Sequence, residues 1–197
     1  MKVYRYPASP NSRKVAMVAE LLGLRLEYEF VDLFAGAQGS AAYLAVNPNG
    51  LVPTLTDDDF ILWESNVIMK YLADRAPAQT LWPANAREQS DIDRWMFWEQ
   101  AHLAGVTFRA ARETLFKSLR GGAPDPAVVT EAIENFRKLA TVLDAALAGR
   151  DYISGGHLSL ADIAISCQLM FSAKSGLPLG EFAHVACWFD RMRASAA

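Results

Sequence analysis

Short apolar runs with a period of two open the chain, and one helical stripe separates them. Residues 2–6 (KVYRY) and 25–33 (RLEYEFVDL) alternate between apolar and polar positions, which predicts two strands. Between them, apolar residues recur with helical spacing from Ser12 to Leu22, and Gly23 stands where a helix C-cap belongs. This order predicts a right-handed βαβ unit.

A hairpin and a closing helix are expected next. The runs VPTLT and FILW flank the three aspartates 57–59, which predicts two antiparallel strands joined by a polar turn rather than a metal site. One helical turn is expected near residues 41–45, and helical spacing returns from Ser65. Residues 1–77 are therefore expected to form one β-α-β-(α)-β-β-α domain.

The second part of the chain has the pattern of long helices. A Pro- and Ala-rich linker is predicted at residues 78–86, and helical stripes follow over 87–119 and 126–148, separated by two glycines. Ser159 and Asp162 are spaced as a capping box at the start of a further helix. Because no strand pattern follows, the predicted fold is α+β with two domains, the second all-helical over residues 87–197.

Composition and charge exclude several classes of protein. The chain has 197 residues, a net charge of −3 and 21% charged residues, without the basic clusters of a nucleic-acid surface. We expect no membrane span and no signal peptide. Cys167 and Cys187 lie in apolar surroundings without a CxxC motif, so we expect two buried thiols and a cytoplasmic protein. The histidines lack the spacing of metal ligands.

Two stretches around the hairpin are candidates for binding chemistry. In NPNGLVP, a cis Val52-Pro53 bond would turn the Val52 N–H and C=O outward for strand-like pairing with a peptide, and a plain proline turn fits equally well. In WESN, Ser65 would open a helix whose N-terminus favours an anion, and Glu64 would attract an ammonium group. For Ser65, an ordinary N-cap is the commoner alternative in an isolated motif.

A third polar stretch, ASPNSRKV, lies between the first strand and the first helix. Ser9, Asn11 and Ser12 would face the end of the sheet, where ligands gather in many α/β folds. Turn residues followed by an N-cap would explain the same letters.

The order and spacing of these motifs resemble the glutathione transferase family over essentially the whole chain. The shared features are a serine loop in the βαβ unit, NP-x-G-x-VP, ES at the third helix and the S-x-x-D box. The resemblance implies a thioredoxin-like N-terminal domain, a helical domain that contributes the electrophile pocket, and a homodimer. It implies detoxification of small hydrophobic electrophiles, with glutathione as co-substrate and no tightly bound cofactor or metal.

The resemblance also assigns roles by position. Ser9 matches the serine that hydrogen-bonds the thiol in serine-type members, so that glutathione reacts as a thiolate. The implied glutathione contacts are Gln38, Leu51, Val52, Pro53, Glu64 and Ser65. Leu51 and Gln38 depart from the basic or amide residues of many relatives, which predicts a weaker hold on the glycyl end. The candidates for the electrophile pocket are Trp95, Trp98, His102, Phe108, Arg109, Arg112 and Phe116.

Two alternatives to conjugation stay open. The loop also resembles the nu class, whose members reduce disulfides or peroxides with glutathione, and there Asn11 would act together with Ser9 at the thiol. Non-catalytic binding or regulatory proteins use the same fold, and a fold alone does not give a function.

Overall fold

The chain divides into two compact units, Met1–Trp82 and Pro83–Ala197. The computed structural model describes residues 1–76 and 80–195. The predicted end of the first domain at residue 77 and the start of the linker at residue 78 lie outside the described residues.

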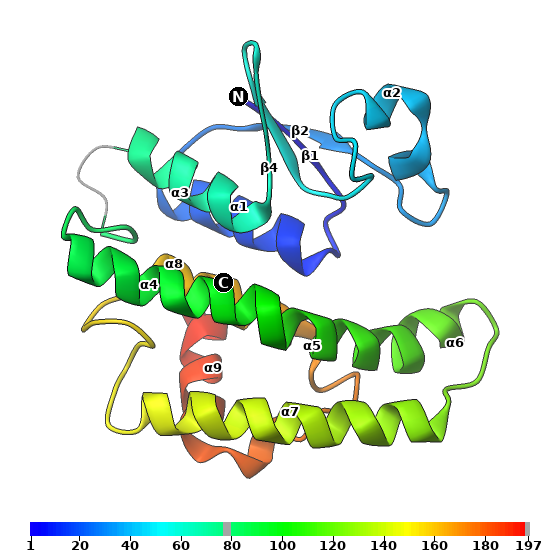
Figure 1. Ribbon diagram of the computed structural model, residues 1–197, viewed down its shortest axis with the longest axis vertical. Helices are drawn as coiled ribbons and strands as arrows, with labels where there is room; N and C mark the ends of the chain where they lie inside the picture. The colour runs from blue at the N-terminus through cyan, green and yellow to red at the C-terminus, as the bar shows by residue number, and fades with distance from the viewer. Residues whose placement is uncertain (77–79, 196–197) are drawn as a thin grey trace. The chain divides into compact units, whose positions relative to one another are not determined.

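The N-terminal unit has the predicted order of elements (Figure 1). They are β1 (Lys2–Arg5), α1 (Pro10–Leu21), β2 (Glu27–Phe30), the 3-10 turn η1 (Ala37–Gly39), α2 (Ala41–Leu44), β3 (Thr54–Asp57), β4 (Phe60–Trp63) and α3 (Ser65–Arg75).

One mixed sheet organises this unit. Its strand order is β2-β1-β3-β4, with β1 parallel to β2 and antiparallel to β3, and with β3 antiparallel to β4. The helices α1 and α3 pack beside each other (Figure 1). Val3 and Leu55, which pair across the two central strands, are fully buried, as are Val15 of α1 and Ile68 of α3. The apolar stripes seen in the sequence therefore form one core between the sheet and the two helices.

The helix α1 begins earlier than the sequence analysis predicted. Ser9 has extended backbone angles and its hydroxyl accepts a hydrogen bond from the N–H of Ser12, so Ser9 is the N-cap. Pro10 occupies the first helical position, which suits its fixed φ angle and missing N–H. The expected start at Ser12 is wrong, and Asn11 and Ser12 belong to the first turn of the helix rather than to a loop.

The C-terminal unit is helical throughout its elements, and all described strands belong to the N-terminal unit. A continuous run over residues 86–119 contains two π-helical segments, and α7 packs against α5 of that run. The elements are α4 (Ala86–Trp98), η2 (Glu99–Leu103, π), α5 (Ala104–Ala111), η3 (Arg112–Phe116, π), α6 (Lys117–Leu119), α7 (Pro126–Leu147), α8 (Leu160–Gln168), two 3-10 turns (Leu169–Phe171 and Leu179–Glu181) and α9 (Ala183–Ser195).

Asp162 is a fully buried carboxylate at the centre of the helical unit. It accepts hydrogen bonds from the Ser159 N–H (3.0 Å), the Ser159 hydroxyl (2.7 Å), the Ile153 N–H (2.9 Å) and the Trp188 indole N–H (3.0 Å). Burial raises the pKa of Asp162, and these hydrogen bonds oppose that shift. The predicted capping box is present, and it also ties α8 to α9 and to the preceding loop.

The expectation of two buried thiols is wrong for one of them. Cys167 is buried in α8, whereas Cys187 is exposed on α9. The buried residues of α9 are Val185, Trp188 and Met192, and this helical spacing leaves Cys187 on the outer face.

Two other features are absent from the described residues, a membrane-spanning helix and a cluster of metal ligands. None of the helices there is long and apolar enough to cross a membrane. No cluster of three or more His, Cys, Asp or Glu side chains there could hold a metal ion.

We expect the substitution Asp162→Ala to lower the free energy of unfolding by about 3 kcal/mol or more, because it leaves several buried donors unpaired. Urea unfolding followed by circular dichroism measures this change. The matched control is Asp190→Ala, which removes an exposed carboxylate from α9 that lies 3.7 Å from Arg193. Equal losses in both variants would contradict the central role of Asp162.

Candidate functional site

Three loops leave the N-terminal sheet at the same end of its strands. In the register of the sheet, Tyr4 of β1 pairs with Thr54 of β3, and Thr54 pairs with Trp63 of β4. The end of β1, the start of β3 and the end of β4 therefore lie in one row. The sheet thus brings the three polar stretches of the sequence, which contain Ser9, Val52 and Glu64, to one end of its strands.

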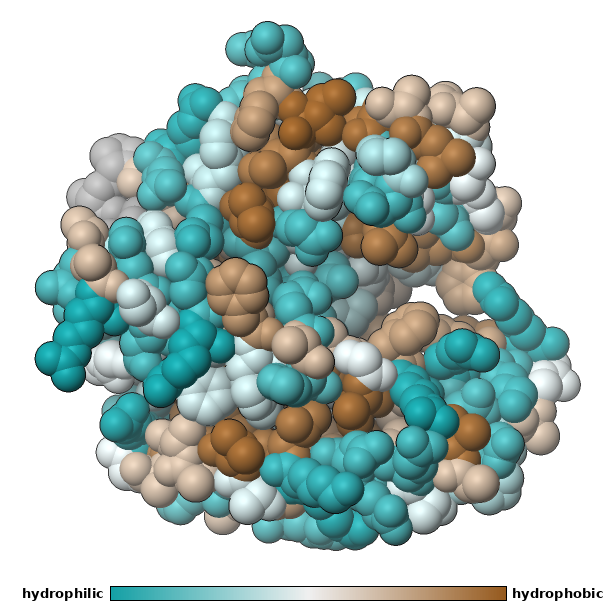
Figure 2. Space-filling model, in the orientation of Figure 1, coloured by the Kyte–Doolittle hydropathy of each residue, from teal (hydrophilic) through white to brown (hydrophobic). Residues whose placement is uncertain are grey.

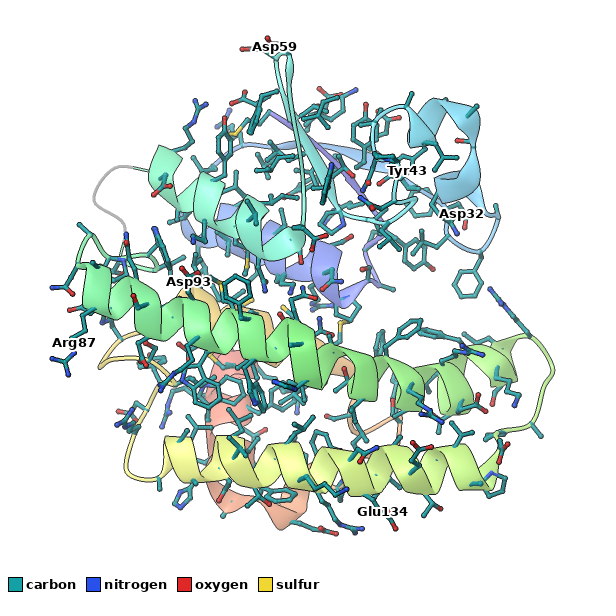
Figure 3. The ribbon with its side chains drawn as sticks, viewed as in Figure 1. Asp32, Tyr43, Asp59, Arg87, Asp93 and Glu134 are labelled. Carbon is teal, nitrogen blue, oxygen red and sulfur yellow. The ribbon has the colours of Figure 1, made fainter. Side chains whose placement is uncertain are left out.

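The segment before β3 is held by two buried side chains that the sequence analysis did not single out. The Tyr43 hydroxyl donates to the Leu51 carbonyl (2.6 Å) and lies 3.1 Å from the Thr54 hydroxyl. The Asn47 amide donates to the same two oxygens at 2.8 and 2.9 Å. Figure 3 shows Tyr43 between α2 and the strands. Burial raises the pKa of Tyr43, which keeps the hydroxyl protonated and able to donate.

The Asn-Pro-Asn-Gly sequence contains a signal for this arrangement. The Asn47 side-chain oxygen Oδ1 accepts hydrogen bonds from the Asn49 N–H and the Asn49 side-chain amide, both at 3.0 Å. This is an Asx turn, a common use of asparagine before a turn. A single turn motif does not reveal that the same amide also reaches forward to β3, so its buried role could be found only in the structure.

The Val52-Pro53 peptide bond is cis, which decides between the two alternatives of the sequence analysis. The Val52 side chain packs against Val31 and Tyr43. The Val52 N–H and C=O make no hydrogen bond with any residue that the structure describes. Backbone groups of this kind normally bind water or a ligand.

Gln38 lies beside the same segment, and Leu51 presents its side chain outward. Gly50 has a φ of +61°, and a Cβ added to it would stand 3.2 Å from the Gln38 carbonyl oxygen, so only glycine fits there comfortably. The Gln38 side-chain oxygen is buried without a hydrogen-bond partner in the described part of the chain. The Leu51 side chain is 64% exposed.

The N-terminus of α3 has no side-chain cap, and the residue that precedes the helix has a strained backbone. Glu64, not Ser65, occupies the N-cap position, with a φ of +72° and no side-chain hydrogen bond to the helix. Side chains cap α1, α4 and α7. In α3, the first N–H groups have no intrahelical acceptor and no cap from Glu64. The ordinary N-cap alternative for Ser65 is wrong, since the buried Ser65 is the first helical residue.

Ser9 has a hydroxyl whose proton is available. Its oxygen accepts a long hydrogen bond of 3.4 Å from the Ser12 N–H, and its proton is donated to no residue that the structure describes. The Ser12 hydroxyl, in contrast, is buried and accepts a hydrogen bond from the Tyr6 N–H at 3.3 Å. Ser9 therefore suits an anionic ligand better than Ser12 does.

An aromatic group beside Ser9 was also missed by the sequence analysis. The Tyr6 ring centroid lies 5.8 Å from that of Phe30 and 6.0 Å from that of Phe34, and the Tyr6 carbonyl accepts a hydrogen bond from the Ser9 N–H. Phe30 and Phe34 are about half exposed. The alternating pattern predicted that Phe30 lies on a strand. It did not predict that the Phe30 side chain is exposed beside Tyr6.

The predicted residues of the electrophile pocket fall into two groups within the helical unit. Trp95, Trp98 and His102 form one chain of ring contacts, and Phe108, Phe116 and Phe171 form another. Phe108 follows Trp98 by ten positions, which corresponds to about 15 Å along an α-helix.

The two arginine candidates differ in their surroundings. Arg109 makes a two-pronged ion pair with Glu131 of α7, at 2.7 and 3.2 Å, and so holds α5 on α7. Arg112 is exposed at the start of the second π-helical segment. Extra residues in π-helical segments re-aim side chains and are frequent at functional sites.

An open cavity of about 350 Å³ in the helical unit contains none of the predicted pocket residues. It lies between the end of α7 and α9, and its lining includes Leu147, Arg150, His184, Cys187, Trp188 and Arg191.

Comparison with known proteins identifies the family. Family models described as the N-terminal and C-terminal domains of glutathione S-transferase match residues 3–80 and 126–194. Glutathione S-transferase 3 of Zea mays is 34% identical over 100% of this chain and 90% of its own length. The chain belongs to the glutathione S-transferase family. The predicted family and fold class are confirmed, and the prediction of a glutathione transferase is confirmed at the level of the family.

Solved transferase structures share the fold. The glutathione S-transferase of Pseudomonas fluorescens superimposes with a TM-score of 0.88 at 30% identity, over 96% of this chain and 92% of that one. A glutathione S-transferase I bound with lactoylglutathione gives 0.86 at 28% identity, over 97% and 92%.

We expect Glu64→Gly to stabilise the fold and to weaken ligand binding. Relief of the strained φ should stabilise the folded state by about 1–3 kcal/mol, and the greater conformational freedom of glycine in the unfolded state should offset about 0.5–1 kcal/mol of this gain. The free energy of unfolding should therefore rise by about 1 kcal/mol, while glutathione affinity falls about tenfold with the loss of the carboxylate. Urea unfolding and calorimetric titration measure the two effects.

The matched control is Asp58→Gly in the hairpin turn, where φ is +52°. Figure 3 shows the neighbouring Asp59 at the tip of this hairpin. The control should gain stability without a change in affinity. A stabilised Glu64→Gly that binds glutathione like the parent would remove Glu64 from the site.

Proposed function

We propose that this chain is a glutathione transferase that binds the tripeptide at the end of the sheet where the loops after β1, before β3 and after β4 meet. The observation that carries this proposal is the sheet register, which brings three open hydrogen-bonding sites to one end of the strands. The first N–H groups of α3 suit the γ-glutamyl carboxylate, and Glu64 suits the ammonium group beside it. The free N–H and C=O of Val52 suit the cysteinyl backbone. Gln38 and Leu51 would contact the glycyl end of glutathione.

Ser9 then lies where the thiol is expected. A free thiol has a pKa of about 8.5, and the thiolate is the nucleophile. The Ser9 hydroxyl proton, which has no acceptor within the described chain, would donate to the sulfur and stabilise the thiolate more than the thiol. A hydrogen bond to a charged group contributes about 1.5–3 kcal/mol, which corresponds to a decrease of about one to two units in the pKa of the thiol. The thiolate attacks an electrophilic atom and displaces its leaving group.

We propose that the electrophile contacts the Tyr6, Phe30 and Phe34 group, which lies beside Ser9 and is partly exposed. An apolar aromatic surface at this position suits a small hydrophobic electrophile. The helical candidates Trp98, His102, Phe108, Arg109 and Arg112 stay predictions for this pocket. The cytoplasmic location and the detoxification role also stay predictions from the family resemblance.

Ser9→Gly should raise the pKa of enzyme-bound glutathione by about one to two units. Glycine is chosen because its cost at an N-cap is only a few tenths of a kcal/mol, whereas alanine costs about 1 kcal/mol. Thiolate absorbance in the ultraviolet, recorded against pH with saturating glutathione, measures the pKa. Ser9→Thr, which keeps the hydroxyl, should retain the parent value.

Ser12→Ala is the comparison within the same helix turn, and we expect it to leave the pKa of the bound thiol unchanged. A shift in Ser12→Ala with none in Ser9→Gly would move the thiol away from Ser9. A panel of substrates separates the reactions. Turnover of an aryl halide supports conjugation, turnover of hydroxyethyl disulfide alone supports the nu-like reductase, and glutathione binding with neither activity supports a binding protein.

We further propose that the chain forms a homodimer through the β4 edge of the N-terminal unit. Phe60, Ile61 and Trp63 of this edge strand are each more than 40% exposed, and Val67 of α3 is exposed nearby in sequence. Figure 2 shows hydrophobic side chains at the visible surface of this unit. Exposed apolar edge strands are usually covered in the native assembly.

Ile61→Lys should convert the dimer to a monomer at micromolar concentration, because it places a charge in the apolar contact. Sedimentation velocity measures the change. Val142→Lys, a similar substitution at an exposed position of α7, should leave the dimer intact. A monomeric parent protein, or a dimer unaffected by Ile61→Lys, would contradict this assembly.

A further inference from the structure

Lys14 is a buried lysine that links the two helices of the proposed glutathione site. Its side chain is fully buried within α1, and its Nζ donates a hydrogen bond of 2.9 Å to the Asn66 side-chain oxygen. Lysine is almost never fully buried without specific partners, because burial of a charged group is costly. This position therefore calls for an explanation beyond packing.

The contact joins two residues next to the functional helix ends. Lys14 lies five residues after Ser9, the N-cap of α1, and Asn66 directly follows Ser65 in the open first turn of α3. The helices α1 and α3 pack against each other. The Lys14–Asn66 hydrogen bond thus connects the helix that carries Ser9 to the helix that carries Ser65. It also gives Asn66, the last residue of the WESN stretch, a structural role.

We propose that Lys14 is a positioning residue for glutathione, an inference that rests on the function proposed above. Its Nζ fixes the Asn66 side chain and with it the first turn of α3, whose N–H groups receive the γ-glutamyl carboxylate. Its positive charge adds to that of the open helix end, which favours an anion there. Lys14 acts through Asn66 and the helix and does not contact the reacting sulfur.

Two substitutions separate the parts of this role. Lys14→Met removes the hydrogen bond and the charge while keeping an unbranched side chain of similar length. Asn66→Asp keeps an acceptor for Lys14 but places a negative charge beside the expected carboxylate. Arg25→Met is the matched control, because it removes an exposed positive charge from the same unit outside α1 and α3.

The experiment measures the Kd of glutathione by calorimetry, together with KM and kcat for conjugation and the unfolding midpoint of each variant. We expect Lys14→Met and Asn66→Asp to raise the Kd and KM for glutathione about tenfold, with kcat at saturating glutathione changed less than about threefold. Arg25→Met should match the parent. A purely structural role would lower the unfolding midpoint without this split between KM and kcat.

The outcomes distinguish this inference from the proposed function. If the parent protein does not bind glutathione, the proposed function fails. If the parent binds and both folded variants bind with the parent Kd, the role of Lys14 is overturned. If Lys14→Met does not fold, Asn66→Leu, which removes the acceptor of Lys14 without adding a charge, decides by the same criterion.

Discussion

The register of one row in the N-terminal sheet is the constraint on which the proposed site depends. Tyr4, Thr54 and Trp63 pair side by side, so three loops far apart in sequence leave the sheet together. Tyr43 and Asn47 then fix the middle loop through the Leu51 carbonyl and the Thr54 hydroxyl. Because a shift of one residue would send alternate side chains to the other face, the core and the site depend on the same pairing.

The site combines open hydrogen-bonding groups with a firmly packed support. The α3 helix end has no side-chain cap, Glu64 has an unfavourable φ, and the Val52 backbone has no partner in the described chain. Each of these features lowers stability, and each is a group that glutathione could satisfy. The buried Asn47 side chain holds the loop that contains Val52, and the Lys14–Asn66 hydrogen bond holds the first turn of α3. Such a division between a strained binding edge and an ordered support is common where binding requires preorganised groups.

The sequence was sufficient for the order of elements and for the family, because those depend on periodicity and on motif spacing. The period-two segments and the long helical stripes predicted the strands and helices correctly, and WESN predicted a special helix end. The start of α1 was misplaced because Pro10 after Ser9 was assigned to a loop rather than to the first helical position. The roles of Tyr43, Asn47 and Lys14 could not be predicted, because each depends on hydrogen bonds to residues that only the folded chain brings into contact. Cys187 was assigned wrongly because apolar neighbours in sequence do not specify a helix face.

A crystal structure of the protein with S-methylglutathione would show whether glutathione binds where the loops after β1, before β3 and after β4 meet. We expect the γ-glutamyl carboxylate at the N–H groups of the first turn of α3, the ammonium group beside Glu64, and the cysteinyl backbone paired with Val52. The sulfur should lie within hydrogen-bonding distance of the Ser9 hydroxyl. A ligand bound elsewhere, or one that leaves the Val52 backbone and the α3 N-terminus without contacts, would contradict this mode of binding.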